Sequence, residues 1–199
     1  MPRLKSAAIA ATLVVVGAAL AGCSSDPVAE QYLEGGNKGF IAGEFRVEEI
    51  APADRGEPVA WAGETETGEA LSSDDTAGSV TVVNFWYAEC GPCIAEAADL
   101  EDVWQDYQDE DVAFVGVNTY NQAATAQSFA RDNDVTYPSI IDVNTGDVKL
   151  AFAAETPIQA TPTTLVLDRE GRIAARIIGQ LESPSVLSTL VGDALAEDA

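Results

Sequence analysis

Hydrophobic and polar positions follow two alternating periods in the second half of the chain. Nearly unbroken runs of apolar and β-branched residues at 80–86 and 112–118 predict strands that are buried on both faces. Between them, apolar residues recur at steps of three and four from Pro92 to about Gln108, which predicts a helix with one buried face. Strand, helix and strand in this order indicate an α/β domain.

The chain beyond these elements predicts shorter ones. Further helices are expected at 122–132, 148–154 and 183–195. A short strand is expected at 139–141. The apolar runs 163–167 and 173–178 flank the turn sequence Asp-Arg-Glu-Gly, so they predict a β-hairpin.

The first half of the chain is less regular. Residues 44–50 have a strand-like composition, and the turn-rich stretch 52–75 contains a segment, 64–69, that predicts a β-hairpin. Residues 23–43 are polar and contain several glycines, so we interpret them as a flexible tether. The folded domain is therefore expected over residues 44–199.

The N-terminus is typical of an export signal. Arg3 and Lys5 form a short basic region, and residues 7–22 form an uncharged, mostly apolar run that is short for a membrane span. The run ends in Leu-Ala-Gly followed by Cys23, which closely resembles a bacterial lipobox. That resemblance implies that residues 1–22 are removed as a signal peptide and that Cys23 carries a diacylglycerol group. An ordinary secretory signal with an incidental cysteine is the alternative.

Charge and composition narrow the classes of function. The chain has 10 Lys and Arg residues against 33 Asp and Glu, and its net charge of −23 becomes −25 once Arg3 and Lys5 are removed with the signal. Such a chain lacks the basic surface that nucleic acids require, so we expect no nucleic-acid partner. It contains no histidine, which excludes Ser-His-Asp hydrolases, Cys-His proteases and His-ligated metal sites. Three cysteines are too few for a four-thiolate zinc site, and we expect neither a metal nor another cofactor.

These exclusions leave electron transfer between sulfur atoms, and the sequence Cys90-Gly91-Pro92-Cys93 is suited to it. It lies between the strand at 80–86 and the helix that follows, and a Cys-x-x-Cys at such a junction is typical of thioredoxin-like redox sites. Cys90 would lie at the helix N-terminus, where free amides and the helix dipole stabilise a thiolate. Pro92 suits the first turn, because its missing N–H is not needed there. We interpret the pair as a dithiol–disulfide couple; a purely structural disulfide is the alternative, although so short a loop gives little stabilisation.

These motifs resemble the membrane-tethered thioredoxin-like proteins of the TlpA/ResA type over about residues 44–195. The matching motifs are Asn84-Phe85-Trp86, Cys90-Gly91-Pro92-Cys93 and Thr161-Pro162-Thr163. The resemblance implies an α/β, thioredoxin-like fold with an N-terminal β-hairpin extension. It also implies a central β/α insertion, here between about residues 122 and 154.

The resemblance further implies roles for single residues. Cys90 would attack a partner's disulfide, and Cys93 would resolve the mixed disulfide that forms. Glu96 falls where many members carry an active-site glutamate; partly buried, it would take the proton of Cys93. A first-turn glutamate favoured by the helix dipole is the alternative for Glu96. Thr161 would present its backbone to a bound peptide beside a cis bond to Pro162.

Two residues near the cysteines need separate interpretations. Trp86 is expected to pack in the core, and a place beside the active site is the second interpretation. Glu89 departs from the family, whose members commonly have tryptophan directly before the first cysteine. A carboxylate there opposes the thiolate of Cys90 and alters the surface that receives a substrate.

Together these features predict a thiol–disulfide oxidoreductase that is lipid-anchored at the extracytoplasmic face of the cell membrane. The resemblance implies reduction of disulfide-bonded partner proteins such as apocytochrome c, with electrons from a membrane thiol–disulfide carrier. An oxidant of exported proteins is the alternative, since direction depends on a reduction potential that no motif states.

Three other functions fit the sequence less well. A thiol peroxidase would need Thr or Ser at the position of Tyr87, three residues before Cys90. A copper-delivery protein would need a different cysteine spacing and a histidine. A non-catalytic binding lipoprotein would need an inert cysteine pair.

Overall fold

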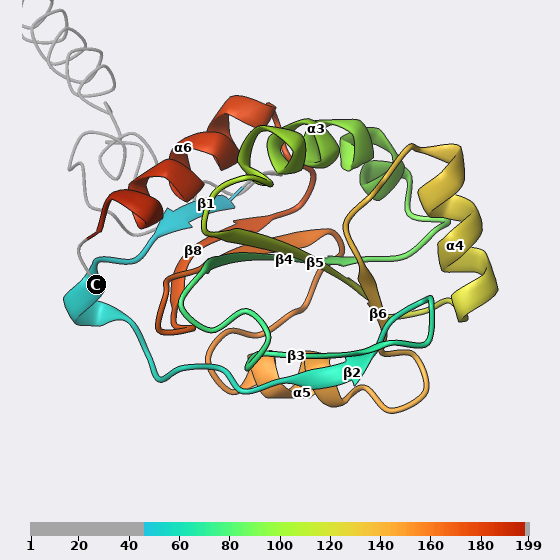
Figure 1. Ribbon diagram of the computed structural model, residues 1–199, viewed down its shortest axis with the longest axis horizontal. Helices are drawn as coiled ribbons and strands as arrows, with labels where there is room; N and C mark the ends of the chain where they lie inside the picture. The colour runs from blue at the N-terminus through green and yellow to red at the C-terminus, as the bar shows by residue number, and fades with distance from the viewer. Residues whose placement is uncertain (1–45, 198–199) are drawn as a thin grey trace, which may run out of the picture. The chain divides into compact units, whose positions relative to one another are not determined.

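The computed structural model describes residues 46–197, and a six-stranded sheet forms their centre. Its strands are β1 (Arg46–Glu49), β4 (Val80–Trp86), β5 (Val112–Asn118), β6 (Ser139–Ile141), β7 (Thr163–Leu167) and β8 (Ile173–Ile178). The strand order is β1-β8-β7-β4-β5-β6, with β4 parallel to β5 and antiparallel to β7 (Figure 1). The strand that leads to the cysteines therefore lies in the middle of the sheet.

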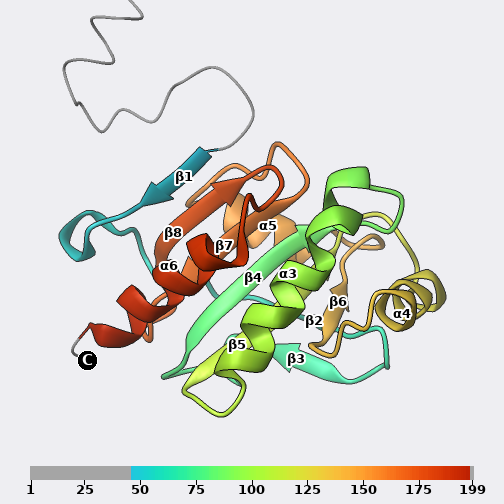
Figure 2. The same cartoon turned by 90° about the horizontal axis from the view of Figure 1, so that it is seen from above.

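Helices cover both faces of the sheet. They are α3 (Gly91–Tyr107), α4 (Ala123–Asp132), α5 (Asp147–Ala153) and α6 (Pro184–Ala196). Helices α3 and α6 lie side by side on one face, α5 lies on the other, and α4 lies beside the β6 edge (Figures 1 and 2). A 3-10 turn, η1 (Pro52–Asp54), precedes a two-stranded sheet of β2 (Ala62–Glu64) and β3 (Ala70–Ser72) on the α5 side.

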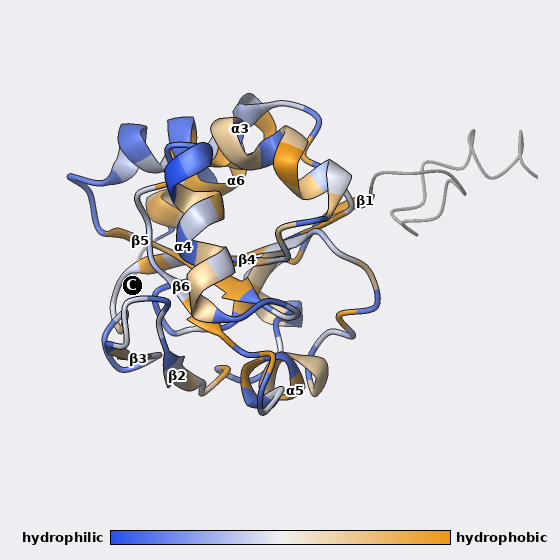
Figure 3. Ribbon diagram, turned by 90° about the vertical axis from the view of Figure 1, so that its right-hand side faces the viewer, coloured by the Kyte–Doolittle hydropathy of each residue, from blue (hydrophilic) through white to orange (hydrophobic). Residues whose placement is uncertain are grey.

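Alternation along β4 separates two hydrophobic cores. Val80 and Val82 pack beneath α3 and α6. Val83 and Phe85 face the other way, where Phe85 meets Phe152 of α5 with ring centroids 5.5 Å apart. Hydrophobic segments accordingly lie along the sheet and the helices, whereas the outer loops are largely hydrophilic (Figure 3). Because side chains alternate between the faces of a strand, the last even-numbered residues of β4 also point toward α3.

The expected fold class is confirmed, including the hairpin β2–β3 and the inserted α4–β6 unit, which extends the sheet beyond β5. Apart from Glu64, the hairpin strands lie outside the expected segment 64–69: residues 65–69 form the turn, and the strands pair on either side of it. The strand expected within 44–50 is β1, and it pairs antiparallel with β8, with Val47 opposite Ile177. The sequence pattern gave no indication of that partner.

Several expectations concern residues that the structure does not describe. The signal peptide at 1–22, the tether at 23–43 and the lipidation site Cys23 lie outside residues 46–197. Within residues 46–197, no helix combines the length and the apolar character that a membrane span requires.

A buried ionic network lies at the end of the sheet away from the cysteines. Arg55 donates to Asp168 at 3.0 Å and to both carboxylate oxygens of Glu197 at 2.6 Å. Asp168 also pairs with Arg172 at 2.9 Å. Burial acts to raise the pKa of Asp168, but hydrogen bonds from Arg172 and Arg55 hold it below its ordinary value. The network ties the segment after β1 to the β7–β8 turn and to the end of α6.

Candidate active site

The two cysteines of the motif form a disulfide at the start of α3. Their Cα atoms lie 5.2 Å apart, and both side chains are buried, whereas Gly91 and Pro92 between them are exposed. Cys90 is the N-cap of α3, and the backbone N–H of Cys93 donates to Cys90 Sγ at 3.2 Å. The sequence produces this arrangement because Pro92, which lacks an N–H, tolerates only the first turn of a helix. The sulfur of Cys90 therefore faces a free backbone donor at a helix N-terminus, as the sequence predicts.

The Thr161–Pro162 loop lies against the disulfide. The Thr161 carbonyl oxygen is 3.8 Å from Cys90 Sγ, and the Thr161–Pro162 bond is cis, as expected. The Pro162 carbonyl oxygen accepts a hydrogen bond from the Gly179 N–H at 2.9 Å, which joins this loop to the end of β8. The structure thus brings residues 71 positions apart in the chain to the same site.

Glu96 lies three residues after Cys93 on α3 and is fully buried, with 0% of the residue exposed, rather than partly buried as expected. One of its oxygens accepts from Asn84 Nδ2 at 3.1 Å and the other from the Leu181 N–H at 2.7 Å. Burial raises the pKa of Glu96 to about 7, although these two hydrogen bonds act to lower it. A first-turn glutamate favoured only by the helix dipole would be solvated, so the alternative interpretation of Glu96 is not supported.

Asn84 also belongs to the site, although the sequence indicated it only as part of the Asn84-Phe85-Trp86 motif. It lies near the C-terminal end of β4 and faces α3, and its amide donates both to Glu96 and to Thr164 Oγ1 at 3.0 Å. Thr164 is its partner across the β4–β7 ladder. A signal for Asn84 was present in the sequence, because a polar residue within an otherwise apolar strand is buried and its amide needs hydrogen-bond partners.

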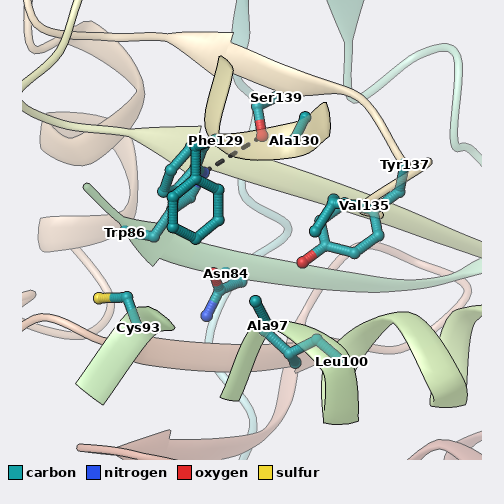
Figure 4. A pocket seen from close by; sticks show the side chains of 10 residues that line it. All are labelled: Asn84, Trp86, Cys93, Ala97, Leu100, Phe129, Ala130, Val135, Tyr137 and Ser139. Carbon is teal, nitrogen blue, oxygen red and sulfur yellow. Dashed lines mark hydrogen bonds between the residues drawn. The ribbon is translucent and has the colours of Figure 1, made fainter. Parts of the chain in front are cut away.

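Trp86 is buried in a hydrophobic cluster that includes Cys90 and Cys93, so it packs in the interior and also lies next to the active site. Its ring packs against Phe129 of α4 at a tilt of 39° with centroids 4.4 Å apart, and its Nε1 donates to Ser139 Oγ at 3.2 Å. Together with Cys93, these side chains line a small cavity between α3 and α4 (Figure 4).

Glu89 is exposed and bonded to the neighbouring loop. Its Oε2 accepts from Asn121 Nδ2 at 2.8 Å. Asn121 Oδ1 in turn accepts from the Ala88 N–H at 2.7 Å and from Asn118 Nδ2 at 3.3 Å. This network ties the loop before Cys90 to the end of β5, and no motif in the sequence predicted it.

The surface beside the disulfide is partly apolar. Ile94, in the first turn of α3, is 47% exposed, and Tyr120 is 69% exposed. Tyr120 lies against Tyr87 with ring centroids 5.7 Å apart. Within residues 46–197 no cluster of His, Cys, Asp and Glu is arranged to hold a metal ion.

Known proteins with similar sequences are named as a thioredoxin-like protein and as thiol-disulfide oxidoreductases. The chain is 31% identical over 120 residues to the thioredoxin-like protein YneN of Bacillus subtilis (strain 168), covering 59% of this chain and 66% of that protein. It is 30% identical over 107 residues to the thiol-disulfide oxidoreductase ResA of Oceanobacillus iheyensis, covering 54% and 53%. The chain thus spans less than two thirds of the length of these curated relatives.

Solved structures and family profiles agree with the fold described above. A DsbF homologue from Corynebacterium diphtheriae superposes with a TM-score of 0.64 and 29% identity, covering 74% of this chain and 92% of that one. The Redoxin profile matches residues 50–191, which is well over half of the chain. With the sheet, the helices and the Cys-Gly-Pro-Cys disulfide in place, this match shows that the chain belongs to the Redoxin family.

Proposed function

We propose that the protein is a thiol–disulfide oxidoreductase in which Cys90 and Cys93 exchange two electrons with a partner protein. The observation that carries the proposal is the disulfide at the N-terminus of α3, followed on the same helix by a fully buried glutamate, Glu96. Burial raises the pKa of this carboxyl group to about 7, and carboxyl groups with raised pKa values are concentrated at functional sites.

Cys90 is the nucleophile in this mechanism. In the reduced protein its thiolate attacks one sulfur of the partner's disulfide, which forms a Cys90–partner bond and releases the other partner sulfur as a thiolate. The Cys93 N–H and the α3 dipole stabilise the Cys90 thiolate before the attack. Thr161 borders the approach to Cys90, and its backbone is the group that pairs with an extended partner segment.

Glu96 is the base of the second step. The Cys93 thiol gives its proton to the Glu96 carboxylate, and the Cys93 thiolate attacks Cys90 Sγ. The bond between Cys90 and the partner breaks, the Cys90–Cys93 disulfide forms, and the partner leaves with both electrons. A general base is most effective when its pKa lies near the working pH, and a value of about 7 meets that condition.

The proposal extends to place and partner. We assign the protein to the extracytoplasmic face of the cell membrane, anchored through lipid on Cys23 after removal of residues 1–22. Its partners would be a disulfide-bonded protein such as apocytochrome c and a membrane thiol–disulfide carrier that returns electrons. The lipobox supports the lipid anchor, and the relatives named thiol-disulfide oxidoreductase support a disulfide-bonded partner. Loss of fatty-acid incorporation on Cys23→Ser tests the anchor.

Oxidation of exported proteins is the second candidate, and a specific observation favours it. The Cys93 N–H and the helix N-terminus stabilise the Cys90 thiolate and therefore the reduced form, which makes a couple more oxidising. A thiol peroxidase has no such support, because Tyr87 lies three residues before Cys90, where the peroxidase motif has Thr or Ser.

Two measurements test the function and its direction. Reduced protein should precipitate insulin by reducing its disulfides, and Cys90→Ser should abolish this activity; an inactive wild type would refute the function. Equilibration with redox buffers then gives the reduction potential. A value near that of thioredoxin, about −270 mV, supports the reductant, and a value near that of DsbA, about −120 mV, supports the oxidant.

A further inference from the structure

The side-chain amide of Asn84 joins three parts of the fold. Its nitrogen donates to Glu96 Oε1 on α3 at 3.1 Å and to Thr164 Oγ1 on β7 at 3.0 Å. An amide nitrogen carries two hydrogen atoms, so each acceptor receives one of them. With the amide reversed, its oxygen would face the Glu96 carboxylate with no hydrogen atom between them. The two bonds therefore determine the orientation of the amide.

Asn84 also lies close to the cysteine that resolves the mixed disulfide. Asn84 and Cys93 line the same small cavity, and Figure 4 shows Asn84 over α3, between Cys93 and Ala97. Asn84 and Glu96 are both buried, so bulk water is not available to replace the bond between them. A bond of this kind contributes most where solvent is excluded.

Two neutral donors stabilise the charged form of Glu96. Burial raises the pKa of this carboxyl group, and the bonds from the Leu181 N–H and from Asn84 act to lower it. Leu181 bonds one oxygen at 2.7 Å and Asn84 bonds the other. Within residues 46–197 Glu96 forms no salt bridge, so these hydrogen bonds are what opposes the cost of burying its charge.

The other titratable groups around Glu96 do not add positive charge. Asp99, on the same helix, acts to raise the pKa of Glu96. Tyr137 approaches from the segment before β6, and burial, with the charges of Glu96 and Glu101, raises the pKa of its hydroxyl, which stays neutral. The remaining neighbour, Cys93, is the group that gives its proton to Glu96 in the proposed mechanism.

We propose that Asn84 is a positioning residue for the resolving step: its amide holds the Glu96 carboxylate ready to accept the proton of Cys93. The inference rests on the proposed oxidoreductase function for its purpose. Each carboxylate oxygen has a second lone pair, so Glu96 takes the proton without losing either bond. The electron pair stays on the Cys93 sulfur, which attacks Cys90, and Asn84 keeps both amide hydrogens. Without this amide, Glu96 would remain protonated at neutral pH and could not act as a base.

The first measurement is the pKa of Glu96 itself. Oxidised protein labelled at the glutamate carboxyl carbons is titrated by NMR, and the Glu96 signal is the one that is missing from Glu96→Gln. Asn84→Leu keeps about the volume of the side chain and removes the amide. It should raise the pKa of Glu96 by about one unit, which means about tenfold less carboxylate well below that pKa. An unchanged titration would overturn the inference.

Two further variants separate the lost donor from other effects. Leucine makes the surroundings of Glu96 less polar, which by itself raises the pKa of an acid. Asn84→Ala adds no apolar bulk next to α3 and should also raise it; a rise in Asn84→Leu alone would refute the assignment to the amide. Gln105→Leu is the matched control, because the Gln105 amide donates in the same way to Glu101 Oε1 at 2.6 Å and to Thr136 Oγ1 at 3.1 Å. It should leave the pKa of Glu96 unchanged, and a shift there would refute the assignment as well.

The second measurement tests whether the carboxylate held by Asn84 serves resolution. When reduced protein is mixed with an excess of the aromatic disulfide DTNB, Cys90 displaces one aromatic thiolate, and Cys93 displaces the second as it closes the disulfide. Only the second phase is independent of the DTNB concentration. Its pH midpoint should rise in Asn84→Leu and Asn84→Ala, as the pKa of Glu96 does. A midpoint that stays in place while that pKa shifts would refute Asn84 as a positioning residue, since a merely structural role would leave it unmoved.

Failure of this inference can be distinguished from failure of the proposed function. The titration of Glu96 in the oxidised protein needs no partner and no turnover, so an inactive wild type in the insulin assay would refute the oxidoreductase without touching the Asn84–Glu96 bond. An active wild type with an unshifted Asn84→Leu titration would refute the positioning role alone. A cooperative urea transition shows which variants are folded. If Asn84→Leu is not, Asn84→Ala decides the question.

Discussion

Replacing Glu96 by glutamine is expected to remove one pH-dependent contribution to stability. Burial raises the pKa of Glu96 from its ordinary value of 4.5 to about 7, against the hydrogen bonds from Leu181 and Asn84. In the unfolded chain the carboxyl group is solvated and titrates near its ordinary value. One pKa unit corresponds to about 1.4 kcal/mol, so the difference between the folded and the unfolded pKa amounts to about 3 kcal/mol of folding free energy.

The sign follows from the direction of the pKa. Because the folded protein holds this proton more tightly than the unfolded chain does, the contribution is fully present below pH 4.5 and is lost as the pH rises through about 7. Above that pH the folded protein contains a buried carboxylate whose hydrogen bonds only partly offset its desolvation. The free energy of unfolding of wild type, minus that of Glu96→Gln, should therefore fall by about 3 kcal/mol across this window.

Urea denaturation of the two oxidised proteins between about pH 4 and 8 measures this difference. Subtraction removes the titration of the other acidic residues, since both proteins share them. Urea is preferred to guanidinium because it carries no charge and leaves electrostatic interactions unscreened. A difference that stays flat would show that Glu96 titrates like a solvated glutamate, and a difference that rises with pH would show that the fold lowers its pKa; either result would refute the role assigned to it.

Three further predictions concern the remaining parts of the molecule. Cys93→Ser should trap a covalent complex between Cys90 and a disulfide-bearing partner, detectable by non-reducing electrophoresis; its absence would contradict Cys90 as the nucleophile. Arg55→Ala should lower the free energy of unfolding by about 3 kcal/mol, because Asp168 and Glu197 lose a buried partner. The exposed Arg131→Ala, as its control, should change it by less than about 0.5 kcal/mol. Glu89→Gln should raise the reduction potential by no more than about 20 mV, measured in redox buffers; a rise of about 60 mV or more would contradict a screened charge.

Local pattern was sufficient for most of the fold. The buried runs at 80–86 and 112–118 coincide with β4 and β5, because continuous apolar composition over seven residues leaves few alternatives to a central strand. The pairing of β1 with β8 could not be predicted from the sequence, since a strand of four residues carries no information about its partner. The hairpin β2–β3 was found but misplaced, because turn residues locate a reversal better than they locate the strands around it.

The site was predictable where residue type alone determines chemistry. Cys90 and Cys93 followed from their spacing and from the helix after them. The full burial of Glu96 was not predictable, because charged residues near helix N-termini are usually solvated and only tertiary contacts bury them.

The charge of Glu89 is a weak determinant of redox direction, despite its place next to Cys90. The side chain is exposed and bonded to Asn121, so its effect on the sulfur acts through solvent, where two charges about 4 Å apart interact by about 1 kcal/mol. For a two-electron couple that corresponds to about 20 mV. The Cys93 N–H and the α3 N-terminus, by contrast, act on Cys90 directly, and hydrogen bonds to a charged group contribute about 1.5–3 kcal/mol. These α3 donors therefore outweigh Glu89 in setting the stability of the Cys90 thiolate, and Glu89 is better placed to select partners than to set the potential.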